Sequence, residues 1–341
     1  MRVVLISYAY SPSVGGIETV SGLLVGALRQ LNHEVVVITA TDGSNDDKTV
    51  LRNPRAGQLV SALRHADAVI QSHVSLRLSW PLFSRIVRKP WMLVLHTDIV
   101  APERSRPWVG ALKRQTFPKQ GTYAVSEDLA RRVSPRVSVI PNPFNSSMFR
   151  STAEKLPASE LLFVGRLVPA KGLDILLRAL ANMTEPPWRL TVVGDGPCRP
   201  DYEALANELK IGDRVIFEGS LPGDEVAQRM ANHSLIVIPS RRQPTEAFGV
   251  VALEAIASGC VPIASRHGGL PEAVGRHGIL FEAEDIHSLQ AALHRAFREP
   301  LEQYMKGSAV HTEAHTPIRV AQAYLTALEA TRRPSRQLDA T

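Results

Sequence analysis

Short hydrophobic runs alternate with amphipathic stretches along most of the chain. The first run, at residues 3–6, is followed by a Gly-containing turn, a helical pattern ending near Leu31 and a second run at 35–38. Strand, turn, helix and strand in this order predict a βαβ unit within a parallel sheet. Similar runs at 68–70, 91–95, 123–125 and 137–140 predict further buried strands.

The alternation is interrupted at Pro141-Asn142-Pro143 and restarts after a polar stretch that ends near Glu160. Prolines and polar residues in such a cluster are typical of a linker. The second set of strands is predicted at 161–164, 189–193, 215–217, 235–238 and 261–264, and helices are predicted at 173–180, 202–209 and 249–257.

These patterns predict the α/β class, with two consecutive doubly wound parallel-sheet domains. The first domain comprises residues 1–145 and the second comprises residues 160–316, with a linker at 146–159. A last amphipathic helix is predicted at about 317–331, and the polar tail at 332–341 is expected to be loose.

Length and composition agree with two globular domains. The 341 residues are enough for two hydrophobic cores, and 44% of them are hydrophobic. Hydrophobic runs fall short of the roughly 20 residues that span a membrane, and the first ten residues are too few for a signal-peptide core. Cys198 and Cys260 form neither a disulfide framework nor a zinc pattern, so we expect a cytoplasmic location.

Charge is unevenly divided between the halves. Residues 1–150 contain 19 Lys and Arg against 10 Asp and Glu, whereas residues 151–341 contain 20 against 23. A basic first half favours an anionic partner such as a membrane surface or a lipid-phosphate substrate, the alternative being a solvated basic surface. Nucleic acid is not expected as a partner because no recognisable nucleic-acid-binding motif accompanies the charge.

Chemically reactive residues follow the predicted strands. Gly15-Gly16 follows the first strand and His96 follows the strand at 91–95, while Arg166 and Lys171 follow the strand at 161–164. Ligands of open α/β sheets bind at the carboxyl ends of the strands. Two cations five residues apart are able to clamp a pyrophosphate. Neither the G-x-G-x-x-G fingerprint nor a P-loop is present.

A segment in the second half contains two carboxylates, Glu246 and Glu254, with Phe248-Gly249 and an apolar helical run between them. An anionic group is able to bind at the start of such a helix, where backbone N–H groups point outward. A nucleotide sugar has a matching layout, since a pyrophosphate joins a hydroxyl-rich group at each end.

In combination these pieces make the chain resemble the retaining, sugar-nucleotide-dependent glycosyltransferases of family 4, the glycosyl transferases group 1. The resemblance runs in family order over about residues 1–290. The matching pieces are Gly15-Gly16-Ile17-Glu18, His96-Thr97, Val125-Ser126, Pro141-Asn142, Gly165-Arg166-Leu167 with Lys171-Gly172, Val193-Gly194-Asp195-Gly196-Pro197, Glu246 with Glu254, and Gly268-Gly269-Leu270-Pro271-Glu272.

The resemblance implies the GT-B fold, in which two Rossmann-like domains face each other across a cleft. It also implies that the helix at 317–331 packs back onto the first domain. The catalytic roles fall on Glu246 and His96 near the transferred sugar, and on Arg166 and Lys171 at the diphosphate. The donor-binding residues it implies are Gly15, Gly16, Arg166, Lys171, Gly219, Ser220, Leu221, Phe248, Gly249, Val250, Val251 and Glu254.

No cofactor and no metal are expected, because the resemblance points to metal-independent enzymes and the chain has no convincing Asp-x-Asp site. Asp98 and Glu103 are candidate acceptor-side groups.

The predicted reaction transfers a hexosyl unit from a nucleotide-diphosphate sugar, with UDP-sugar favoured and GDP-mannose next. The acceptor is expected to be a lipid-linked or cell-surface polysaccharide precursor, with the enzyme at the inner face of the cell membrane.

Other functions compete with this interpretation. A soluble small-molecule acceptor and a GT-B sugar-nucleotide epimerase are the main alternatives. A non-catalytic nucleotide-sugar binder and a Rossmann oxidoreductase fit less well, since every matched position is intact and the dinucleotide fingerprint is missing.

Overall fold

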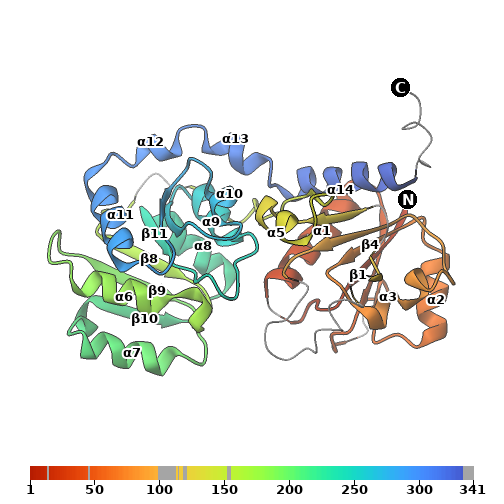
Figure 1. The fold of residues 1–341 in the computed structure, drawn as a ribbon, viewed down its shortest axis with the longest axis horizontal. Helices are drawn as coiled ribbons and strands as arrows, with labels where there is room; N and C mark the ends of the chain where they lie inside the picture. Colours follow the sequence, from red (N-terminus) through yellow and green to blue (C-terminus); the bar gives the residue numbers. More distant parts are fainter. Residues whose placement is uncertain are drawn as a thin grey trace. The chain divides into compact units, whose positions relative to one another are not determined.

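The computed structural model describes residues 1–13, 15–44, 47–98, 113, 115–117, 121–151 and 155–332. The chain divides into two compact units, and each contains one parallel sheet with helices around it (Figure 1). Unit 1 comprises Met1–Phe144 and His315–Thr341, and unit 2 comprises Asn145–Ala314.

Within the described residues, unit 1 has a seven-stranded sheet in the order β3-β2-β1-β4-β5-β6-β7, with parallel pairing throughout. The direction of winding reverses between β1 and β4, so right-handed crossovers place helices on both faces of the sheet. The elements are β1 (Arg2–Ser7), α1 (Gly16–Gln30), β2 (Glu34–Thr39), β3 (Val50–Arg52), α2 (Ala56–Arg64), β4 (Ala68–Ser72), α3 (Leu76–Phe83), β5 (Trp91–Leu95), β6 (Thr122–Ala124), α5 (Glu127–Val133) and β7 (Ser138–Val139).

The last helix, α14 (Pro317–Arg332), packs on unit 1 although it follows unit 2 in sequence. It contacts α1 and β5, and it buries Tyr324 and Leu328 almost completely. The chain leaves and re-enters unit 1 at one place, where the Phe144 N–H donates to the carbonyl oxygen of His315 over 3.2 Å.

Unit 2 has a six-stranded sheet among the described residues, in the order β10-β9-β8-β11-β12-β13, again with parallel pairing. The winding reverses between β8 and β11. The elements are β8 (Glu160–Val164), the 3₁₀ turn η1 (Pro169–Lys171), α6 (Leu173–Ala181), β9 (Arg189–Val193), α7 (Arg199–Glu208), η2 (Gly212–Arg214), β10 (Val215–Gly219), α8 (Gly223–Asn232), β11 (Leu235–Ile238), α9 (Val250–Ala257), β12 (Val261–Ser265), α10 (Leu270–Val274), β13 (Ile279–Phe281), α11 (Ile286–Arg298), α12 (Glu302–Met305) and α13 (Ser308–Glu313).

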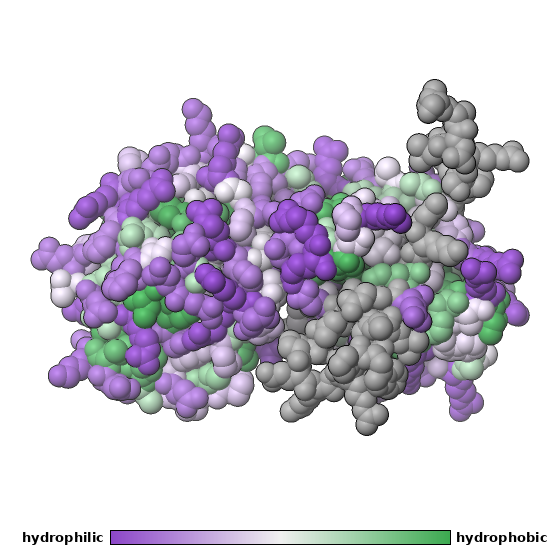
Figure 2. Space-filling model, viewed as in Figure 1, coloured by the Kyte–Doolittle hydropathy of each residue, from purple (hydrophilic) through white to green (hydrophobic). Residues whose placement is uncertain are grey.

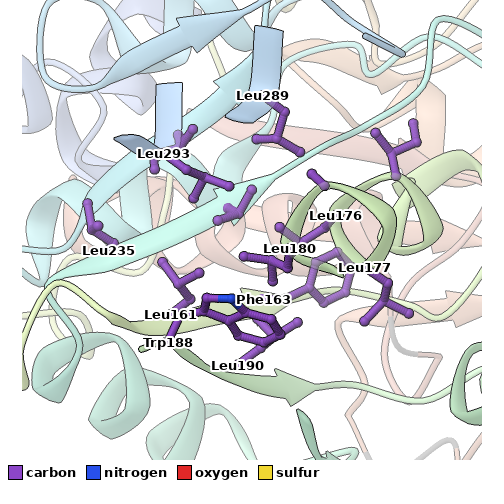
Figure 3. Close-up of a cluster of buried hydrophobic side chains, with 14 of the residues drawn as sticks. Leu161, Phe163, Leu176, Leu177, Leu180, Trp188, Leu190, Leu235, Leu289 and Leu293 are labelled. Atoms are coloured by element: carbon purple, nitrogen blue, oxygen red, sulfur yellow. The ribbon is translucent and has the colours of Figure 1, made fainter. Parts of the chain in front are cut away.

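The core of unit 2 forms where α6 covers the centre of the sheet. Leu176, Leu177 and Leu180 project from α6 toward β8 and β9, where they meet Phe163 and Trp188 (Figure 3). The indole N–H of Trp188 donates to the carbonyl oxygen of Met183 over 2.8 Å, so its polar atom is satisfied inside this core. Outside the core, the visible face of unit 2 is mainly hydrophilic, with scattered hydrophobic groups (Figure 2).

The predicted α/β class with two doubly wound parallel sheets is confirmed. Some boundaries differ, because the predicted strand at 137–140 contracts to Ser138–Val139 and the helix predicted at 202–209 begins at Arg199. The edge strands β3 and β13 are three residues long and were not predicted. No helix in the described part of the chain combines the length and apolar composition of a membrane span.

Candidate active site

The best-defined group of candidate residues lies at the winding reversal of unit 2. Arg166 and Lys171 follow β8, and Glu246 lies on the connection that follows β11. These two strands are hydrogen-bonded neighbours, although β9 and β10 come between them in sequence. Carboxyl ends of adjacent parallel strands meet at one edge, and a winding reversal leaves a crevice there for a ligand.

A glycine brings the two loops together. Gly172 has a φ of 67°, in the left-handed region, and a Cβ atom at this position would overlap with the carbonyl oxygen of Pro239. Only glycine allows this approach. It places Lys171, the preceding residue, beside the connection that carries Glu246.

Lys171 and Glu246 form an ion pair. Lys171 Nζ donates to Glu246 Oε2 over 2.5 Å, and the Ser240 hydroxyl lies 3.5 Å from the same oxygen. Arg166 is exposed and has no ion pair among the described residues. The site therefore has two cations and only one carboxylate that balances them directly, which suits an anionic ligand.

The backbone around Glu246 is held by the glycine pair Gly268-Gly269. The Gly269 N–H donates to the carbonyl oxygen of Glu246 over 2.9 Å. Gly268 has a φ of 60°, and a Cβ atom on either glycine would overlap with the carbonyl oxygen of Glu246 or Ala247. This close packing explains the paired glycines and fixes the backbone from which Glu246 projects.

Helix α9 follows this loop and starts after Gly249, which has a φ of 85°. The predicted residues Phe248, Val250 and Val251 therefore lie around the helix start, where backbone N–H groups lack intrahelical partners. Glu254 is the fifth residue of α9, and it has no ion pair among the described residues. Burial raises the pKa of its carboxyl to about 7.

Glycines lie at the carboxyl ends of the neighbouring strands β8, β9 and β10. The Gly194 N–H donates to the carbonyl oxygen of Gly219 over 2.7 Å, and a Cβ atom on Gly194 would overlap with the carbonyl oxygen of Gly165. Gly219 has a φ of 78°. The predicted base-pocket residues Ser220 and Leu221 continue from it at the same edge of the sheet as Arg166.

Unit 1 contains the remaining predicted residues, which are Gly15, Gly16 and His96. Gly16 begins α1 and Gly15 is the N-cap, with an extended φ of 179°. Neither glycine has a positive φ, so the turn does not need glycine for that reason. A Cβ atom on Gly16 would meet no heavy atom of the described chain within 4 Å, whereas one on Gly15 would contact the Glu18 carboxylate.

His96 follows β5 and is buried. Burial lowers the pKa of its imidazole to about 3, with nearby His73 adding to the shift and the Asn142 side chain opposing it. Its Nδ1 atom has no hydrogen-bond partner among the described residues. The ring is therefore neutral at physiological pH and is able to act as a hydrogen-bond donor or acceptor.

His73 is a further candidate that was not predicted from the sequence. It follows β4, and burial together with the charge of Lys113 lowers the pKa of its imidazole to about 4. The signal was its position directly after a buried strand at the winding reversal. Asp98 forms ion pairs with Arg132, so this acceptor-side candidate has a structural partner, while Glu103 lies outside the described residues.

Metal binding has no obvious site in the described part of the chain. It contains no group of three or more His, Cys, Asp or Glu side chains placed to hold a metal ion.

Comparisons with known proteins identify the family of the region that contains this site. Residues 145–309 match the family model described as Glycosyl transferases group 1. The chain is 32% identical over 145 residues to the GDP-mannose-dependent alpha-(1-6)-phosphatidylinositol monomannoside mannosyltransferase of Mycolicibacterium smegmatis, covering 40% of this chain and 38% of the relative. It is 34% identical over 206 residues to the D-inositol 3-phosphate glycosyltransferase of Acidothermus cellulolyticus, covering 55% of this chain and 45% of the relative.

The chain therefore spans less than half the length of these two curated relatives. A solved structure is similar over nearly the whole chain: Anabaena Alr3699/HepE in complex with UDP has a TM-score of 0.79 at 20% identity, covering 97% of this chain and all of that one. This likeness concerns the fold. Residues 145–309 therefore form a domain of the glycosyl transferases group 1 type, and the two units have the GT-B fold.

Proposed function

We propose that this chain is a retaining glycosyltransferase that moves a hexosyl unit from a nucleotide-diphosphate sugar to an acceptor hydroxyl. The observation that carries the proposal is the group at the winding reversal of unit 2, where Arg166 and Lys171 stand beside Glu246. Glu254 follows on the next helix. A nucleotide sugar matches this layout, because its diphosphate lies between two groups of hydroxyls.

Each residue has a role in this reaction. Arg166 and Lys171 bind the diphosphate and stabilise the charge that grows on it as it leaves. When Lys171 pairs with the phosphate and no longer with Glu246, the Glu246 carboxylate becomes available to accept hydrogen bonds from hydroxyls of the transferred sugar. Glu254 accepts hydrogen bonds from the ribose hydroxyls. Its partly buried position strengthens those bonds because the local dielectric is low.

The chemical step needs no protein nucleophile. The bond between the anomeric carbon and the leaving phosphate oxygen breaks, and the acceptor oxygen bonds to the same face of the sugar. The acceptor proton passes to the departing phosphate oxygen, so no residue is assigned as a general base.

The imidazole of His96 is neutral, so it serves as a hydrogen-bonding group for the transferred sugar and not as a positively charged group.

The donor is proposed to be a UDP-sugar, with GDP-mannose as the second choice. The similar Anabaena structure contains UDP, and the similar mycobacterial enzyme is GDP-mannose-dependent. A thermal-shift panel of UDP, GDP, UDP-glucose, UDP-galactose and GDP-mannose tests this, since a ligand that binds the native state raises the melting temperature. If none of these nucleotides stabilises the protein, the proposed function is wrong.

The acceptor is proposed to be lipid-linked or a cell-surface glycan precursor, reached from the inner face of the membrane. Unit 1 has a surface patch at the end of α3 that supports this. Phe83 and Ile86 are 36% and 52% exposed there, beside the exposed Arg85 and Arg88. We call these four residues and Lys89 the α3 patch. Exposed apolar side chains beside cations suit an anionic bilayer surface.

Liposome sedimentation tests the membrane proposal. We expect binding to anionic vesicles that weakens with salt and is lost in the double variant Arg88→Glu with Lys89→Glu. The matched control makes the same charge change in unit 2, at the exposed Arg298 and Lys306. Absence of binding at low salt, or equal loss in both double variants, would favour a soluble acceptor. Arg104, Arg106 and Arg114 also belong to the basic first half, and they lie outside the described residues.

A further inference from the structure

Arg241 links the two loops of the candidate site. It lies on the connection between β11 and α9, five residues before Glu246. Its backbone N–H donates to the carbonyl oxygen of Ala170 over 2.8 Å, and its Nε donates to the carbonyl oxygen of Pro169 over 3.1 Å. Both acceptors belong to η1, the short turn that ends in Lys171.

The guanidinium of Arg241 also reaches the residues that follow Lys171. Its Nη2 atom donates to Asp174 in the first turn of α6, and its Nη1 atom lies 3.4 Å from Glu284 Oε1. Pro169 and Ala170 precede Lys171, whereas Asp174 follows it. Arg241 therefore holds the backbone on both sides of Lys171, which a planar guanidinium with several N–H donors is suited to do.

We propose that Arg241 is a positioning residue that keeps Lys171 in place when a nucleotide-diphosphate donor binds, a role that rests on the proposed function. In the free protein Lys171 also holds the two loops together directly, through Glu246. A bound diphosphate would take Lys171 away from Glu246 and remove that link. The contacts of Arg241 use backbone carbonyl groups and the carboxylates of Asp174 and Glu284, none of which is assigned to the ligand, so they persist during binding.

The neighbouring Arg242 provides a matched control. Its side chain is 57% exposed, compared with 30% for Arg241, and its Nε atom lies 3.9 Å from Glu284 Oε2. Replacing Arg242 with alanine removes the same charge from the same loop without removing a contact to η1.

Hydrogen–deuterium exchange, measured without any ligand, tests whether Arg241 holds the backbone on both sides of Lys171. We expect Arg241→Ala to increase amide exchange in residues 169–174, and Arg242→Ala to leave it unchanged. Arg241→Lys keeps the charge but loses the forked geometry, so it should give an intermediate increase, and it carries the test if the alanine variant does not fold. Unchanged exchange in folded Arg241 variants would overturn the proposal.

Nucleotide affinity, measured by calorimetry with UDP and GDP, tests the consequence. We expect Arg241→Ala to weaken binding about tenfold in the wild-type background and less than about twofold in Lys171→Ala, because residues that act through one another are not additive. An equal loss in both backgrounds would overturn the positioning role, since it indicates a general structural defect. If the wild-type protein binds neither nucleotide, the proposed function fails, and the exchange experiment still decides whether Arg241 tethers the loop.

Discussion

The ammonium of Lys171 lies 2.5 Å from the carboxylate of Glu246, although the two residues are 75 positions apart in the sequence. The pair forms because β8 and β11 are neighbours at the winding reversal. It also makes the two residues interdependent, since a ligand that attracts Lys171 frees Glu246.

Loss of either cation should reduce transfer strongly. We expect Arg166→Ala and Lys171→Ala each to lower kcat/KM about 30- to 900-fold, because each removes a charge-assisted contact to the leaving diphosphate. This corresponds to a loss of about 2–4 kcal/mol of transition-state stabilisation. Steady-state kinetics with the donor found in the thermal-shift panel measures this. Arg178→Ala, at an exposed position on α6, is the control and should leave kcat/KM unchanged. Near-normal kinetics in both site variants would contradict the assignment.

The two carboxylates should have separable effects. Glu254→Gln should mainly weaken UDP or GDP binding, because ribose contacts exist before and after the chemical step. Glu246→Gln should mainly lower kcat, because contacts to the sugar matter most as the anomeric centre ionises. Calorimetry and kinetics on the same preparations distinguish the two effects. An equal fall in nucleotide affinity in both variants would rule out this division of roles.

Glu254 should also make stability depend on pH. Burial raises the pKa of its carboxyl from 4.5 to about 7, so between these values the folded protein retains a proton that the unfolded chain releases. Stability contributed by this group is therefore present below pH 4.5 and is lost as pH rises to 7. Glu254→Gln should be more stable than wild type at pH 8 by about 1–3 kcal/mol, with little difference at pH 4.5. Urea denaturation at both pH values measures this, and an equal difference at both would refute it.

Replacing Gly172 or Gly16 with alanine should have different effects on stability. Gly172→Ala should destabilise the protein by at least about 2 kcal/mol, because φ is positive and the added methyl group overlaps with Pro239. Gly16→Ala should change stability by less than about 1 kcal/mol, since a Cβ atom there meets no described atom, yet it should lower transfer if the α1 start approaches the phosphates. Normal activity in Gly16→Ala would remove Gly16 from the donor site.

Much of the architecture could be predicted from local patterns. A buried parallel strand is a short apolar run and a covering helix is amphipathic, so both appear within a few residues of sequence. The positions of Arg166, Lys171 and Glu246 after strands could be found in the same way. The edge strands β3 and β13 could not, because three residues are too few to establish a pattern.

The sequence by itself determined the order of the longer strands and the helices between them, the presence of two α/β domains and the residues that lie at strand ends. Only the tertiary structure decided which strand ends meet. The ion pair between Lys171 and Glu246, the approach of Gly172 to Pro239 and the bridge made by Arg241 all join the loop after β8 to the loop after β11. The physical reason is that strand adjacency at a winding reversal depends on how the whole sheet packs and hydrogen-bonds, which no local run of residues encodes.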